Sequence, residues 1–170
     1  MKASVEWLKE YSDIDVDTIK LGDILTMTGS KVETIDQKGN DIKNVVIGKI
    51  LEIEKHPDAD KLVITKVDVG TEILQIVTGA NNIKENDIVP IAKDGAELPG
   101  GVKIKAGVIR GEKSNGMMCA LYEIGIDKKF LSEADKNGIC ELPENAVPGE
   151  DPIKFLGLDD SVIDFDLTAN

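Results

Sequence analysis

The sequence has little of what many active sites and RNA-binding surfaces are built from. It holds one histidine, one tryptophan and two cysteines, and aromatic side chains make up 4% of its 170 residues. Cys119 and Cys140 match no metal-binding spacing, and the histidine, His56, is far from both in sequence. We therefore expect two buried thiols in a reducing compartment, and no metal site.

Long apolar runs are missing as well. No stretch approaches the roughly 20 residues that cross a membrane, and no apolar signal-peptide core follows Lys2 at the start. With 41% hydrophobic and 31% charged residues, the composition is that of a folded globular protein. We expect a cytoplasmic protein without a membrane partner.

Positive charge is scarce overall and concentrated locally. The formal net charge is −12, which is unusual for a general nucleic-acid binder. Between residues 99 and 113, however, the only acid is Glu112, and the basic side chains there are Lys103, Lys105, Arg110 and Lys113. Arg110 is the only arginine of the chain. If RNA is bound, this local field must attract it, because the net charge repels it.

The first forty residues predict two helices and a strand. Ser4 is placed to cap the first helix, and a second should begin after Asp17 and stop at Gly29. Alternating residues predict a strand over 31–36.

The last twenty residues predict a short helix and a half-buried strand. Asp151 is placed as a cap before Pro152, and Gly157 should end that helix. Ile163, Phe165 and Leu167 then alternate with acids. Neither this tail nor residues 1–40 can bury a sufficient core alone. We therefore expect residues 1–40 and 151–170 to form one discontinuous, incomplete α/β domain, in a chain that is mainly β with α+β flanks.

Residues 41–150 predict a separate, mainly β domain. Short β-branched segments bounded by turn residues predict five strands, at 45–53, 62–69, 73–77, 87–92 and 102–109. Five strands at this spacing suggest a small closed barrel. One helical turn over 120–125 and one more strand over 138–142 are also expected. Met117 and Met118 are predicted to pack in the core.

Two local motifs and both flanks carry a resemblance to a known family. The motifs run from His56 to Leu62 and from Lys113 to Ala120, and they resemble a tRNA-binding module with an OB-fold, a small β-barrel. The flanks, including Trp7 to Tyr11 and Leu156 to Asp160, resemble the N-terminal part of the bacterial phenylalanyl-tRNA synthetase β subunit. Asn86 departs from this family, where a turn glycine is common, but asparagine also tolerates positive φ.

The resemblance implies a function that the residues alone do not give. It implies a truncated β subunit with no catalytic residues of its own, serving an α₂β₂ ligase that uses ATP and Mg²⁺. The implied partners are tRNA, the α subunit and the rest of β. A second reading stays open, in which the chain is a stand-alone dimeric tRNA-binding module outside any synthetase.

The candidate RNA contacts are basic and polar residues of the central domain. We predict Lys61, Lys93, Lys103, Lys105, Arg110, Lys113, Ser114 and Asn115. The alternative for the charged ones is a solvated face without a ligand. Tyr122 is the only aromatic between residues 45 and 125, so stacking of single-stranded bases is not expected. Contacts should instead go to phosphate and sugar on a folded RNA shape.

Residues of the first motif have competing interpretations. His56 is suited to acid–base chemistry, to an RNA contact or to a structural role at a strand–loop junction, and the last is favoured because no partner group is evident. Asp58 and Asp60 are compatible with a metal or with glycoside chemistry. We interpret them as turn formers whose carboxylates bond nearby N–H groups.

Overall fold

The computed structural model describes residues 1–166, apart from the side chain of Ala134, and divides into two compact units. One unit joins residues 1–40 to the segment that begins at Gly157, and the other spans Asp41–Leu156. The second unit ends at Leu156, beyond the predicted domain boundary at 150/151, because Phe155 and Leu156 pack against its core. Within the described residues, no helix is long and apolar enough to cross a membrane.

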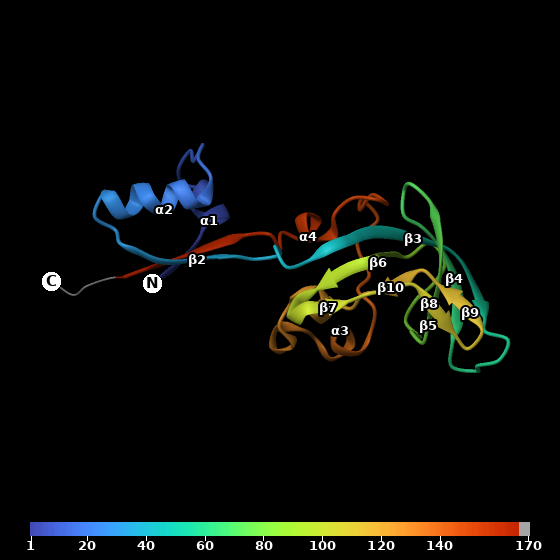
Figure 1. The fold of residues 1–170 in the computed structure, drawn as a ribbon. Coiled ribbons are helices and arrows are strands. Elements are labelled where there is room, and N and C mark those ends of the chain that lie inside the picture. Colours follow the sequence, from blue (N-terminus) through green and yellow to red (C-terminus); the bar gives the residue numbers. More distant parts are fainter. Residues whose placement is uncertain (167–170) are drawn as a thin grey trace. The chain divides into compact units, whose positions relative to one another are not determined.

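The first unit is a three-stranded antiparallel sheet with two helices on one side (Figure 1). Its strands lie in the order β1-β11-β2. The bounds are β1 Lys2–Ser4, α1 Val5–Lys9, α2 Thr18–Met27, β2 Val32–Gln37 and β11 Ser161–Phe165. The Met1 amino group donates to the Phe165 carbonyl oxygen over 2.7 Å, which joins both parts of this unit. Because its sheet is antiparallel, the unit is α+β, as predicted for the flanks, and not an α/β domain.

Capping side chains set the helix ends of this unit as predicted. Ser4 Oγ accepts the N–H of Trp7 at 3.0 Å, and the Asp17 carboxylate accepts the N–H of Lys20 at 3.0 Å. Gly29, with φ of 106°, follows the end of α2. Leu167 of the predicted last strand lies outside the described residues.

The second unit is mostly β. Its strands are β3 Lys43–Lys55, β4 Val63–Asp68, β5 Ile73–Thr78, β6 Ile88–Leu98, β7 Val102–Lys103, β8 Gly107–Ile109, β9 Glu112–Ser114 and β10 Gly116–Met118. Its short helices are α3 Glu133–Asn137 and α4 Pro152–Phe155, and 3₁₀ turns lie at Pro99–Gly101, Leu121–Ile124 and Lys128–Phe130. Asp151 caps α4, with Pro152 at its first position, as predicted.

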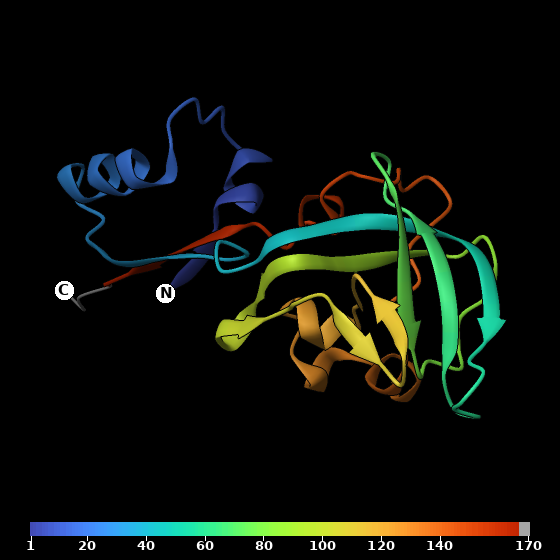
Figure 2. The ribbon, with the colours of Figure 1, turned by 45° about the vertical axis from the view of Figure 1, so that its right-hand side comes forward.

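The large sheet of this unit curls until its two outer strands meet (Figure 2). The strand order is β10-β6-β3-β4-β5. Between β5 and the residues that lead into β10, the N–H of Asn115 donates to the Gln75 carbonyl oxygen over 2.8 Å. A register shift between Ile50 and Glu52 lets the long strand β3 pair with β6 through its first half and with β4 through its second.

The core fills the interior of the curled sheet. Its buried members are Ile50, Val67, Val69, Leu74, Ile76, Val89, Ile91 and Met118. Met118 is buried as predicted, whereas Met117 is half-buried.

Two strand predictions in this unit are wrong. Residues 102–109 are not one strand, because the segment leaves β6 after Ile104, and the N–H of Ala106 turns to the Asp94 carboxylate at 2.7 Å. Residues 138–142 form only an isolated bridge between Leu142 and Ile88. The helical turn expected at 120–125 is a 3₁₀ turn, and Asn86 has the positive φ, 74°, that asparagine was expected to tolerate.

Both cysteines are buried as free thiols. Burial raises the pKa of Cys119 to about 12 and that of Cys140 to about 11. Since the thiolate is the reactive form of cysteine, neither side chain is a nucleophile at neutral pH.

Alkaline pH is expected to destabilise the folded chain through these thiols. In the unfolded chain their pKa returns to the ordinary 9.0, so above that pH the unfolded state loses thiol protons that the folded state keeps. The stabilisation is complete below pH 9 and is lost as pH rises towards 11 and 12. Urea unfolding of the parent and of Cys119→Ala, each at neutral and alkaline pH, checks this. The free energy of unfolding should fall more with pH in the parent, and equal falls would contradict the prediction.

Candidate nucleic-acid interface

The basic segment between β6 and β10 ends in a tight hairpin. Strands β8 and β9 pair with Ile109 opposite Glu112, so only Arg110 and Gly111 form the turn. Both have positive φ, 52° and 93°, as a primed two-residue turn requires. The only arginine of the chain therefore sits exposed at the hairpin tip.

The two faces of this hairpin differ in their contacts. Lys113 lies opposite Val108, and both side chains are exposed. Ser114 lies on the other face and is buried, where its Oγ accepts the N–H of Val77 at 3.1 Å and donates to the Gly116 carbonyl oxygen at 3.1 Å. The Ser114 hydroxyl is thus occupied within the fold. Asn115, the next residue, is half-buried.

Lys93 and Lys103 already have acidic partners. Lys93 Nζ lies 2.6 Å from Glu72 Oε1, and Lys103 Nζ lies 3.3 Å from Glu97 Oε1. Glu97 also bonds Lys43, and these two lysines, Lys43 first, lower the pKa of the Glu97 carboxyl. Such pairs, which water reaches, contribute little to stability, so a phosphate can replace the carboxylate at little cost.

The basic residues do not gather into one cluster. Lys103 belongs to β7, which pairs with the end of β6, whereas Arg110 is at the tip of the β8–β9 hairpin. In Figures 1 and 2, β7 and this hairpin lie at different places along the connection. Lys105 lies between them and is exposed. The segment therefore presents a strip of separate positive charges.

The loop over 56–62 lies beside this hairpin and is closed by its own bonds. The N–H of His56 donates to the Leu62 carbonyl oxygen at 3.1 Å, and the N–H of Leu62 donates to that of Ala59 at 3.0 Å. Lys61 is exposed on this loop.

His56 is 5% exposed, and both of its ring nitrogens are bonded. Nδ1 accepts the N–H of Asp58 at 3.1 Å, so the ring proton is on Nε2. Nε2 therefore donates to the Ile109 carbonyl oxygen, 3.2 Å away in the β8–β9 hairpin. The geometry agrees with a structural role.

Asp58 and Asp60 lie in turns as predicted, but the prediction that their carboxylates bond nearby N–H groups is wrong. Among residues 1–166, no bond to either carboxylate is found, and both residues are exposed. The ring of His56 supplies the acceptor that we assigned to them. Within residues 1–166, no three His, Cys, Asp or Glu side chains are grouped closely enough to hold a metal ion.

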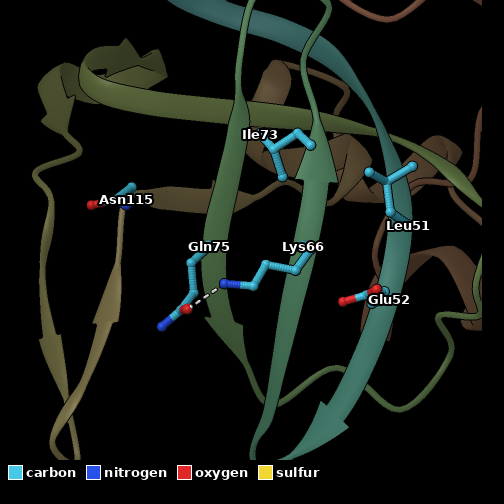
Figure 3. A pocket seen from close by; sticks show the side chains of 6 residues that line it. All are labelled: Leu51, Glu52, Lys66, Ile73, Gln75 and Asn115. Atoms are coloured by element: carbon cyan, nitrogen blue, oxygen red, sulfur yellow. Dashed lines mark hydrogen bonds between the residues drawn. The ribbon is translucent and has the colours of Figure 1, made fainter.

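Sequence reasoning missed a shallow groove of about 510 Å³ on the outer faces of β3, β4 and β5. It is lined by Leu51, Glu52, Lys66, Ile73, Gln75 and Asn115 (Figure 3). Lys66 Nζ donates to Gln75 Oε1 at 2.7 Å, and Gln75 Nε2 donates to the Lys113 carbonyl oxygen at 3.0 Å. A weak signal was present, since the polar residues Lys66 and Gln75 stand among apolar residues of β4 and β5. The lining has no aromatic ring on which a base could stack.

Comparisons with known proteins show which family and which relatives this chain is similar to. The model of a family described as "Putative tRNA binding domain" matches residues 45–151. Over 171 aligned residues, the chain is 57% identical to the phenylalanine–tRNA ligase β subunit of Clostridium acetobutylicum and 51% identical to that of Clostridium tetani. Both alignments cover 100% of this chain and 21% of the relative, so the chain spans about a fifth of the length of these curated relatives.

A likeness among solved structures is weaker. The MetRS related protein from Pyrococcus horikoshii aligns with 24% identity and a TM-score of 0.43, over 62% of this chain and 84% of that one.

Proposed function

The chain belongs to the family of putative tRNA-binding domains, and from this premise we propose that it is the N-terminal, tRNA-binding part of a phenylalanine–tRNA ligase β subunit. One observation carries the proposal. The similarity to these β subunits covers the whole chain, including residues 1–40, which lie outside the tRNA-binding match. A stand-alone module would have no need of that unit.

We propose further that residues 41–156 form an OB-fold. The support is the strand order, in which β3 pairs with both β4 and β6, while β5 meets the residues leading into β10. That connectivity closes a five-stranded barrel in which β7, β8 and β9 belong to one long connection.

In this proposal the barrel binds tRNA through its phosphates and sugars. The contacts are made by Lys61, Lys93, Lys103, Lys105, Arg110, Lys113 and Asn115, while Ser114 holds the hairpin in place from inside. Cations at the surface can follow a folded backbone without reading its bases. The aromatic-free groove supports the same mode, because it offers no stacking platform.

The proposed whole enzyme joins phenylalanine to its tRNA in the cytoplasm with ATP and Mg²⁺. The α subunit and the later part of β supply its chemistry, in an α₂β₂ assembly. The present residues contribute tRNA binding and a small α+β unit.

Weak, salt-dependent tRNA binding is expected from the isolated chain. Four neutralised phosphates give a slope of about −3 to −4 in a plot of log affinity against log salt concentration. Filter binding or fluorescence anisotropy between 50 and 300 mM salt measures it. A slope near zero would contradict phosphate binding.

The full-length ligase tests the proposed site directly. After photocrosslinking to tRNA, labelled peptides should come from residues 56–62 and 93–116, with peptides from residues 1–40 as the internal control. Labelling confined to the control peptides would exclude the site. The isolated chain should neither activate phenylalanine nor deacylate mischarged tRNA. A stable homodimer with sub-micromolar tRNA affinity would instead favour the stand-alone module.

A further inference from the structure

His56 is a buried histidine to which the proposed tRNA binding assigns no role. It makes no contact with RNA in that proposal, because only 5% of the residue is exposed. Its two ring bonds nevertheless go to two different segments. Nδ1 accepts from Asp58 within loop 56–62, and Nε2 donates to Ile109 in the β8–β9 hairpin.

These two segments each carry a cation at an exposed position. Lys61 lies in loop 56–62, one residue before Leu62, whose carbonyl oxygen accepts the N–H of His56. Arg110 directly follows Ile109, whose carbonyl oxygen accepts the ring proton. The ring of His56 thus connects the loop that carries Lys61 to the hairpin that carries Arg110.

The hairpin depends on such an external bond. Each of its strands has three residues, and an isolated pair of this length is not stable in water. Its end at Ser114 is fixed to β5 through Val77. Towards the tip, the described residues provide the Ile109–His56 bond, a 3.2 Å bond from Gln75 Nε2 to Glu112 Oε2 and a 3.0 Å bond from Gln75 Nε2 to the Lys113 carbonyl oxygen. The first of these holds the backbone next to Arg110.

We propose that His56 is a positioning residue that fixes the Lys61 loop and the Arg110 hairpin as a two-sided clamp for one stretch of RNA phosphate backbone. This inference rests on the proposed tRNA binding. The clamp works by preorganisation, since a tip that is already held loses less freedom when its guanidinium meets a phosphate. Arg110 suits this task, because its planar fork contacts a phosphate through two donors.

Two substitutions separate the two ring bonds. In His56→Gln, the amide nitrogen reaches the place of Nε2 and can donate to Ile109, whereas the acceptor for Asp58 is lost. In His56→Asn, the amide oxygen stands near Nδ1 and can accept from Asp58, whereas the bond to the hairpin is lost. We expect His56→Asn to weaken tRNA binding about tenfold, with a salt slope shallower by about 0.7 to 0.9. His56→Gln should stay within about threefold of the parent.

A third substitution tests whether the effect passes through Arg110. Asparagine tolerates the left-handed conformation of that position, so Arg110→Asn removes the guanidinium and keeps the turn. Combining His56→Asn with Arg110→Asn should weaken binding no further than Arg110→Asn alone. Additive losses, or equal losses in His56→Asn and His56→Gln, would assign His56 a general structural role and overturn the clamp.

Amide hydrogen exchange tests the anchoring by His56 independently of the proposed tRNA binding. The amides of residues 107–113 should exchange faster in His56→Asn than in the parent or in His56→Gln. Unchanged exchange in His56→Asn overturns the anchoring even if tRNA binding falls. If the parent itself fails to bind tRNA, the proposed function fails and the clamp fails with it, whatever the exchange shows.

Discussion

Reversing the charge of Lys103, Lys105, Arg110 and Lys113 to glutamate is expected to reduce tRNA affinity roughly 100-fold at low salt. The reason is the release of counterions. Each cation that neutralises a phosphate contributes about 0.7 to 0.9 to the salt slope, so losing four such contacts removes most of a slope of about −3 to −4. All four side chains are exposed, so the fold should tolerate the change. Affinity measured across a salt series shows both effects in one experiment.

A charge-matched control separates a local site from general repulsion. Four exposed lysines of the other unit, Lys2, Lys9, Lys20 and Lys38, can be changed to glutamate instead. Each set of four reversals lowers the net charge by eight from −12. The control should lose less than tenfold in affinity and keep its slope. Equal losses in both variants would show that net charge, and not the basic segment, governs binding.

Local chemistry explains which parts of the fold could be predicted. Ser4, Asp17 and Asp151 each cap a helix through a bond to an N–H two or three residues ahead, and such bonds need no distant partner. Gly29 ends α2 for a similarly local reason. Strands β3 to β6 were found because their β-branched residues form continuous apolar segments.

The strand that closes the sheet could not be found in this way. Strand β10 is Gly116–Met118, which has no β-branched residue, and its partners β6 and β5 are distant in sequence. The segment 102–109 has a stronger strand pattern, yet it is divided into β7 and β8, and the Asp94 carboxylate binds the N–H of Ala106 between them. Pairing over such distances depends on tertiary contacts that propensity does not contain.

For the candidate site, the sequence likewise indicated which residues are basic but not the contacts that those residues make. Composition locates the basic residues of the central unit, but it cannot show that Glu72 already pairs with Lys93. Nor could it show that Ser114 points inward, because the register of β8 and β9 decides that. The bond from His56 to Ile109 joins residues 53 apart, so no local pattern predicts it.

A large effect on stability is expected at Gly116. Its φ is 146°, in the range that side chains rarely adopt, and an added Cβ would lie 2.6 Å from the Ala92 carbonyl oxygen. That oxygen belongs to β6, the partner of β10, so it cannot move without disturbing the pairing. Backbone strain and overpacking each cost about 1–3 kcal/mol. Gly116→Ala should therefore lower the free energy of unfolding by about 3 kcal/mol, measured by urea titration.

Gly107 provides the matched control, since it also lies in a short strand of this unit. Its added Cβ would meet no atom within 4 Å, and its φ is not positive. Gly107→Ala should change stability by less than about 0.5 kcal/mol. If Gly116→Ala proves as harmless as this control, β10 is not held against β6 as described. Because β10 also follows the β8–β9 hairpin directly, loss of its pairing should release that hairpin and weaken tRNA binding together with stability.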